Sequence, residues 1–204
     1  MPVGKLPKSR CLSSLKLAKV EVTFAGNTIP LVEGFDTVGG QLVVSYGLTS
    51  GGGTGTRSNR IGTLALDGTI SNSVTFSASD DLDGIAVDRQ GQFFGVDSRS
   101  PNGGSAILLI SLTPPSTTEL ATIGSTTTFI VDLAFTDTDL LFGLDLDKRI
   151  HQIDPLTGNS LTSVPFDSSL TLRGLAFIPE PSTLVLLSMG VVGLLAYAWR
   201  KLRR

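Results

Sequence analysis

Residues 84–97 read GIAVDRQGQFFGVD, which is a short apolar run, a polar turn containing Gly91, and a second apolar run. The same plan occurs in GFDTVGGQLVV at residues 34–44 and in DLAFTDTDLLFGLD at residues 132–145. Its beginning recurs in RGLAF at residues 173–177. Short apolar runs separated by Gly- and Asp-containing turns predict β-hairpins, because these residues supply the backbone angles that tight turns need.

A second hairpin follows each full copy of this plan. The second hairpins are predicted at Ile61–Phe76 around Asp67-Gly68, at Ile107–Ile123 around Pro114-Pro115, and at Ile150–Val164 around Asp154-Pro155-Leu156-Thr157-Gly158. The copies begin at residues 34, 84, 132 and 174. Two hairpins in a period of about 40–50 residues describe a four-stranded propeller blade. The sequence therefore predicts an all-β domain over residues 20–178, with three to four propeller-like blades.

How the blades close is left open by the sequence. A strand predicted from the alternation of Val20, Val22 and Phe24 can complete the partial fourth copy, which would give a small four-bladed ring. Alternatively, the chain is the C-terminal part of a longer propeller, or the strands form an open β-sandwich. The repeat unit resembles the blades of secreted NHL- or YVTN-like propellers, through the stretches GIAVD, GQFFGVD and IDPLTGN.

The C-terminal segment, residues 179–204, has a different chemistry. Pro179-Glu180-Pro181 is followed by an uncharged, largely apolar run over residues 182–199. As a helix of about 1.5 Å per residue, this run approaches the roughly 30 Å thickness of a bilayer core, so we predict a transmembrane helix. Tyr197 and Trp199 are placed for the membrane interface, and the basic residues behind them would stay in the cytoplasm: Arg200, Lys201, Arg203 and Arg204.

Two simpler interpretations of this segment are a buried helix of a soluble domain and a permanent tail anchor. The order of Pro-Glu-Pro, apolar helix and terminal basic cluster resembles the PEP-CTERM sorting signal of Gram-negative bacteria. The resemblance implies that an exosortase, a membrane-embedded cysteine transpeptidase, recognises Pro179-Glu180-Pro181 and cuts near it. The helix would then be a temporary inner-membrane anchor, and the mature protein would reach the cell surface or the extracellular medium. It also implies an association with exopolysaccharide and the biofilm matrix.

Charge is strongly segregated along the chain. Five basic residues lie within residues 1–19 and four within residues 200–204, while seven Lys/Arg and all 18 Asp/Glu lie between, which leaves a formal charge of −11 there. An acidic middle argues against nucleic-acid binding, since phosphates require a basic surface. Residues 1–19 are expected to be poorly ordered and contain no apolar signal-peptide core. We therefore expect a start site assigned too late or a truncated gene, or insertion by the C-terminal helix alone.

Few residues point to chemistry. His151 is the only histidine and is expected on the exposed side of its strand, and the sequence has no Gly-x-Ser-x-Gly motif and no Cys/His cluster for zinc. Cys11 is the only cysteine, which excludes an intrachain disulfide. Acidic clusters at Asp80-Asp81-Leu82-Asp83 and Asp145-Leu146-Asp147 are either solvated strand ends or calcium ligands. We assign no catalytic residue, no metal site and no cofactor, with calcium as the one remaining option.

The expected function is that of a non-enzymatic, exported surface or matrix protein. Its sorting signal gives its destination, and its β-repeats give a surface for binding. Its expected partners are an exosortase, membrane lipid around the C-terminal helix, and exopolysaccharide or other matrix components. The alternatives are a secreted propeller enzyme of the lactonase or lyase type, and a permanently tail-anchored membrane protein.

Overall fold

The repeat region of the chain folds as an all-β domain. The computed structural model describes residues 23–24, 27–28, 31–48, 57–98, 103–124, 129–167, 169 and 174–176. Every regular element in these residues is a β-strand, and none of them forms a helix that is long and apolar enough to cross a membrane. The transmembrane helix predicted at residues 182–199 lies outside the described residues.

Three four-stranded antiparallel sheets follow one another along the described chain, and within each sheet neighbouring strands are hydrogen-bonded in chain order. The first blade contains β3 (Leu31–Val38), β4 (Gln41–Gly47), β5 (Arg60–Leu64) and β6 (Ile70–Thr75). The second contains β7 (Gly84–Val87), β8 (Phe93–Asp97), β9 (Ser105–Leu112) and β10 (Pro115–Ile123). The third contains β11 (Ile130–Phe135), β12 (Leu141–Asp145), β13 (Arg149–Ile153) and β14 (Ser160–Pro165). The predicted hairpins and blade period are confirmed.

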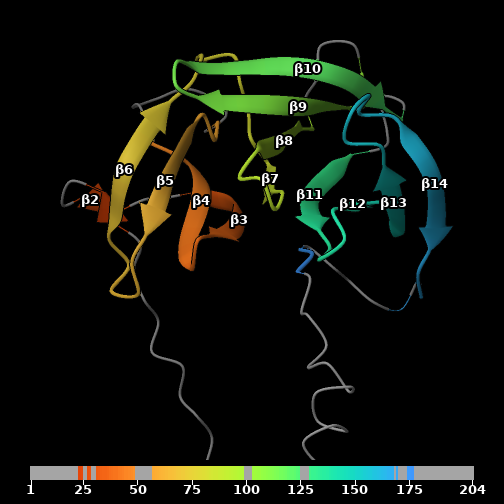
Figure 1. Ribbon diagram of the computed structural model, residues 1–204, viewed down its shortest axis with the longest axis horizontal. Helices are drawn as coiled ribbons and strands as arrows, with labels where there is room; N and C mark the ends of the chain where they lie inside the picture. Colours follow the sequence, from red (N-terminus) through yellow and green to blue (C-terminus); the bar gives the residue numbers. More distant parts are fainter. Residues whose placement is uncertain are drawn as a thin grey trace, which may run out of the picture.

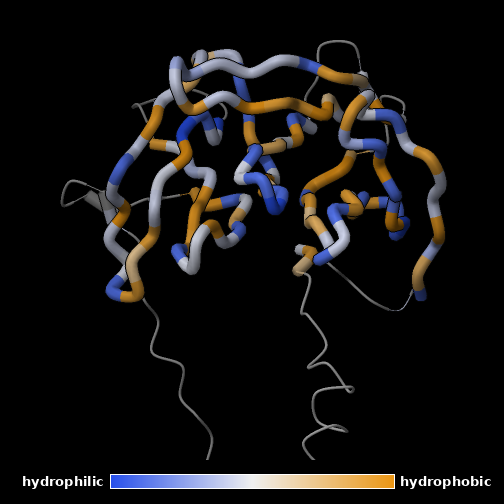
Figure 2. Tube along the Cα trace, in the orientation of Figure 1, coloured by the Kyte–Doolittle hydropathy of each residue, from blue (hydrophilic) through white to orange (hydrophobic). Residues whose placement is uncertain are grey.

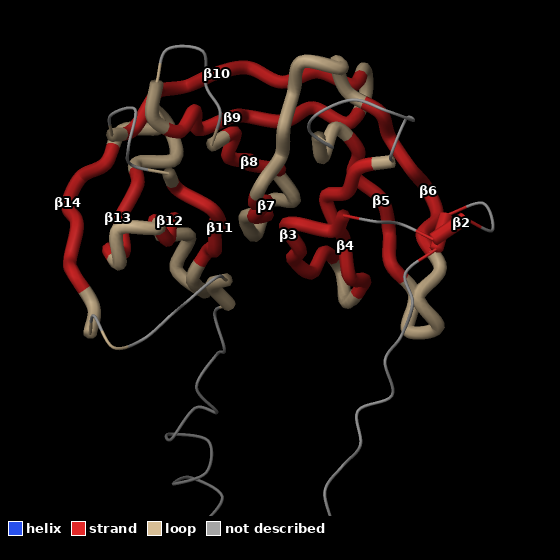
Figure 3. The backbone as a smooth tube through the Cα atoms, turned by 180° about the vertical axis from the view of Figure 1, so that it is seen from behind, coloured by secondary structure: helices blue, strands red, loops and turns tan. Residues whose placement is uncertain are grey.

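The blades fan around a common axis, as in a propeller. Figure 1 shows the first strand of each blade, β3, β7 and β11, at the centre of the fan, with β6, β10 and β14 outermost. Figure 3 shows the same arrangement from behind. Residues 174–176 lie beside β11, where Leu175 donates its backbone N–H to the carboxylate of Asp132. They begin the partial fourth repeat.

One of the arrangements that the sequence left open is not seen in its described part. β1 (Thr23–Phe24) pairs with β2 (Asn27–Thr28) and not with residues 174–176. Thr23 also bridges to Thr69, and its N–H donates to the carbonyl of Gly68 at 2.8 Å. In its described residues, β1 is therefore bonded to the turn at the edge of the first blade and not to the partial fourth repeat.

The hydrophobic core lies between neighbouring blades. Ile85 and Val87 of β7 belong to the core shared with the first blade, together with Val43, Ile61 and Phe76. Ala86, between them in sequence, belongs to the core shared with the third blade, together with Phe94, Ile107, Leu133 and Leu141. Because alternate side chains of a strand point to opposite faces, β7 is apolar throughout and buried on both faces. Hydrophilic residues gather at the turns (Figure 2).

Close approach of the inner strands depends on glycine. A Cβ atom on Gly34 would lie 2.6 Å from the backbone nitrogen of Ile85, and a Cβ atom on Gly84 would lie 2.6 Å from Cα of Asp132. Both distances are too short for real contacts. The repeat therefore begins with glycine at these positions because no side chain fits between the inner strands.

Replacing Gly84 by Ala should destabilise the domain by about 1–3 kcal/mol, since the added methyl group meets backbone atoms that cannot move aside cheaply. Gly174→Ala should cost clearly less, because the nearest atom to its Cβ is a carboxylate oxygen of Asp132 at 3.3 Å. Urea unfolding of the two variants measures the difference. Equal free energies of unfolding for Gly84→Ala and the wild type would show that the close approach of the inner strands does not require glycine at this position.

Candidate functional site

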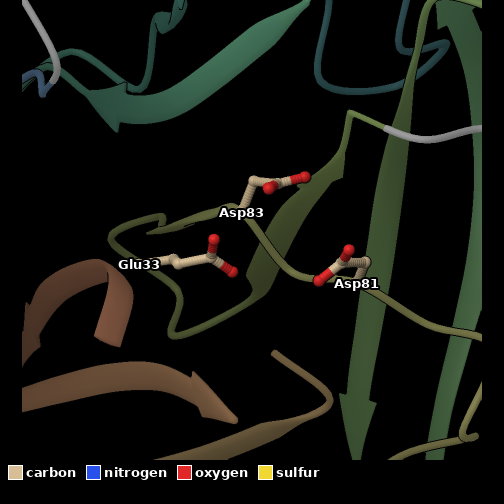
Figure 4. A group of neighbouring side chains, drawn as sticks. All are labelled: Glu33, Asp81 and Asp83. Atoms are coloured by element: carbon tan, nitrogen blue, oxygen red, sulfur yellow. The ribbon is translucent and has the colours of Figure 1, made fainter. Parts of the chain in front are cut away.

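Three carboxylates gather at the end of the axis where the inner strands begin. Glu33 lies near the start of β3, and Asp81 and Asp83 lie in the segment that leads into β7. One oxygen from each side chain lies within 4.8 Å of the other two. Figure 4 shows the Glu33 carboxylate pointing toward the segment that carries both aspartates. Glu33 and Asp83 each directly precede the glycine that opens a repeat, so the repeat itself brings them together.

Backbone hydrogen bonds hold this segment in place. Asp81 is buried, and its Oδ1 accepts the backbone N–H of Ser58 at 2.9 Å. Leu82 donates its N–H to the carbonyl of Ser58 at 2.8 Å, which fixes the same segment from the other side. Asp83 accepts the N–H of Ser98 through Oδ2 at 2.7 Å. The two aspartates are therefore positioned by the fold itself.

The electrostatics of this cluster favour either a proton or a cation. Burial raises the pKa of Asp83, and the negative charges of Asp81 and Asp97 raise it further, against hydrogen bonds from Ser98 that lower it. Carboxylate oxygens are the hard ligands that calcium prefers, although calcium takes six to eight oxygens in all. Glu33, Asp81 and Asp83 could thus hold a divalent cation, with backbone carbonyls or water completing its coordination.

The two acidic clusters seen in the sequence lie in different environments in the structure. Asp81 and Asp83 belong to the carboxylate group; Asp81 is buried and Asp83 is half-buried, so the cluster is not simply a solvated loop edge. Asp145 is buried too, but its Oδ1 accepts the N–H of Arg149 at 2.7 Å and its Oδ2 lies 2.8 Å from Nε2 of His151. Both oxygens of Asp145 are used within the blade, so the geometry gives no support to calcium at Asp145-Leu146-Asp147.

The expectation of an exposed His151 is wrong. The ring is buried, with Nε2 at 2.8 Å from Asp145 Oδ2 and Nδ1 at 3.2 Å from Ser160 Oγ. These are the residue types of a catalytic triad, but Ser160 Oγ also donates to the backbone carbonyl of Thr162, and the three residues join β12, β13 and β14. We interpret the network as structural, because it ties the outer strands of the blade together.

A second pair of carboxylates faces the axis further along the inner strands. Asp132 stands where the other copies have Gly34, Gly84 and Gly174. Its Oδ2 accepts the N–H of Leu175 at 2.7 Å and its Oδ1 that of Leu133 at 2.9 Å, while Asp36 accepts the N–H of Val87 at 2.7 Å. Burial raises the pKa of Asp132 to about 6; the two backbone N–H groups oppose this shift, and the charge of Asp36 adds to it.

A comparison with known families assigns the C-terminal segment. Residues 177–204 match the PEP-CTERM protein-sorting motif. The resemblance drawn from Pro-Glu-Pro, the apolar run and the basic end is confirmed. The sorting motif marks the chain as a protein of the cell envelope or an exported protein, sorted by an exosortase. No curated protein sequence matches the chain significantly.

One solved structure supports the propeller-like fold of the repeat region, and two others are given with it for comparison. A putative gluconolactonase is 18% identical over 78% of this chain and 56% of its own, with a TM-score of 0.51. Virginiamycin B lyase from Staphylococcus aureus is 18% identical over 74% of this chain and 42% of its own, with a TM-score of 0.43. A protein of unknown function from Bacteroides caccae is 12% identical over 66% and 46%, with a TM-score of 0.45. The chain thus spans about half the length of these structures, and the likeness concerns the fold alone.

The predicted residues of the sorting motif lie outside the described residues. These are Pro179, Glu180, Pro181, Tyr197, Trp199, Arg200, Lys201, Arg203 and Arg204. Glu33, in contrast, lies within the described residues, but the sequence did not predict it as a ligand. Its position directly before the first repeat, equivalent to that of Asp83 before the second, is the signal that could have found it.

Calcium at millimolar concentration should raise the melting temperature of the protein, because a cation bound only by the folded state stabilises it. Glu33→Gln should abolish most of this shift, and should itself raise stability in the absence of calcium by relieving repulsion between like charges. Asp137→Asn, at an exposed turn, serves as the control. Differential scanning calorimetry with and without calcium measures both effects. A calcium-induced shift that Glu33→Gln leaves unchanged would place the cation elsewhere.

Asp132 should make stability fall as pH rises. Because its folded-state pKa is raised, its contribution is fully present below the unfolded-state value near 4 and is lost as pH rises through about 6. Asp132→Asn removes the charge but keeps only one acceptor oxygen for the N–H groups of Leu133 and Leu175, so the stability of this variant should depend less on pH over this range. Urea unfolding between pH 4 and 8 tests this, with Asp137→Asn as the control. A variant with the same pH profile as the wild type would refute the assignment.

Proposed function

We propose that this protein is displayed at the cell surface or in the extracellular matrix after an exosortase removes its C-terminal segment. Pro179-Glu180-Pro181 is the recognition element, and residues 182–199 are the temporary membrane anchor. The observation that carries this proposal is the match of residues 177–204 to the sorting motif, directly after the last described part of the repeat domain at residue 176. The sorting motif and the folded repeat domain are thus separate parts of one chain.

The repeat domain acts in binding and not in catalysis. His151 is used within the third blade, away from the axis, and no catalytic residue is assigned. Residues 20–199 carry a formal charge of −11, so nucleic acid is not a partner. The partner we propose is a component of the extracellular matrix such as an exopolysaccharide. Propeller-like blades suit such a role, since their turns and edges present many surfaces on a rigid core.

One observation favours a second candidate function. Glu33, Asp81 and Asp83 meet at the end of the axis, where a bound cation would polarise a substrate carbonyl. A secreted lactonase- or lyase-like enzyme would use such a site. An activity assay separates the two functions. An enzyme turns over lactone or polysaccharide substrates, and Asp81→Asn abolishes the reaction. A binding protein releases the same compounds unchanged.

Replacing Pro179, Glu180 and Pro181 together by Ala should block removal of the C-terminal segment. The full-length form should then accumulate in the membrane fraction, because the apolar run is retained there. Immunoblots of whole cells, membranes and medium, with an epitope tag in the exposed turn at residues 155–157, measure both effects.

Thr183→Ala, just beyond the motif, is the control and should be processed normally. Normal processing of the triple-alanine variant would exclude recognition through Pro-Glu-Pro. A wild-type chain that keeps its C-terminal segment indefinitely in a strain with an active exosortase would instead establish a permanent tail anchor.

A further inference from the structure

The second blade has a hollow of about 520 Å³ that the cation site and the sorting motif do not involve. It lies where β8 begins, β9 ends and β10 begins, and it extends to the turn between β7 and β8. All of the residues that line it come from this one blade. Its volume is within the range of about 300–1,000 Å³ that is typical of small-molecule sites.

The lining is polar but carries no ionisable group. The polar side chains are two amides and four hydroxyls: Gln90, Gln92, Ser111, Thr113, Ser116 and Thr118. Leu109 contributes apolar surface, whereas the side chain of Phe93 is buried in the core shared with the first blade. Ser111 is paired with Ser116 and Leu109 with Thr118 across β9 and β10, and directly opposed residues share one face of a sheet. The hydroxyls of Ser116 and Thr118 thus stand on the same side of β10.

These groups make few hydrogen bonds within the protein, and most of them are exposed to solvent. Within the described part of the chain, no hydrogen bond engages the side chains of Gln92, Ser111, Ser116 or Thr118, whereas Gln90 donates weakly to Asp139 at 3.4 Å. An amide has both donors and acceptors, and so does a hydroxyl. A ligand rich in hydroxyl groups can therefore exchange donors and acceptors with every polar group of the lining.

We propose that this hollow binds a short stretch of a neutral polysaccharide. The inference deepens the proposed function, on which it rests, by giving the matrix partner a binding site and a chemical class. A neutral polyol matches a lining without charge, and an anionic chain of uronic acids is disfavoured by the net negative charge of the surrounding domain. The ligand contacts the amide of Gln92 and the hydroxyl of Thr118.

The test is isothermal titration of the purified full-length chain with three tetrasaccharides: cellotetraose, maltotetraose and, as the anionic probe, tetragalacturonate. At least one neutral tetrasaccharide should bind, and tetragalacturonate should bind more weakly. Gln92→Ala and Thr118→Val should each weaken binding of the neutral probe by roughly threefold to tenfold, the equivalent of one neutral hydrogen bond.

Matched controls come from the other blades. Gln41 follows the glycine turn of the first blade as Gln92 follows that of the second, and Thr162 holds on β14 the place that Thr118 holds on β10. Gln41→Ala and Thr162→Val should leave binding unchanged. Absence of binding by both neutral probes at millimolar concentration would overturn the proposal, as would binding that Gln92→Ala and Thr118→Val leave intact. Since export and tail removal are measured separately in cells, a failure here leaves the sorting function standing.

Discussion

The structure depends on how closely the inner strands of neighbouring blades approach one another at the axis. Gly34 and Gly84 leave no room for a Cβ atom, so backbone packs against backbone there. Next to this contact, the side chains of β7 reach the cores shared with both neighbouring blades. The rest of each blade widens outward from this point, where the strands have space for larger side chains. Glycine at the start of the repeat is thus a constraint on the whole domain.

The same constraint concentrates charge at the axis. The residue before each of these glycines lies at the end of the inner strands, which brings Glu33 and Asp83 into one group with Asp81. Further along, Asp132 replaces glycine and reaches the backbone of Leu175 with its carboxylate. Buried like charges oppose folding unless protons, hydrogen bonds or a cation compensate them. We therefore expect pH and divalent cations to act on the domain through these axial carboxylates.

The sorting motif and the repeat domain are different parts of the chain. The sorting motif over residues 177–204 consists of a short Pro-Glu-Pro peptide, an apolar run and a basic end, which are recognisable in the sequence alone. The repeat domain needs its fold, because neither the carboxylate group nor the hollow in the second blade exists in any single hairpin. The uncharged hollow and the acidic axis also differ in chemistry, so one domain offers two kinds of surface to its surroundings.

The hairpins, the blade period and the sorting motif were determined by the sequence alone. Each depends on residues close together in the chain: the alternation of GIAVD and GQFFGVD, the turn at Asp67-Gly68, the order of Pro179-Glu180-Pro181 and its flanks. Three features were decided only by tertiary structure. β1 pairs at the edge of the first blade, Glu33 meets Asp81 and Asp83 from a separate repeat, and His151 is buried by Asp145 and its neighbours. Local patterns specify backbone conformation, but which groups share a buried space depends on how the blades turn about the axis, and that angle is set by packing between distant residues.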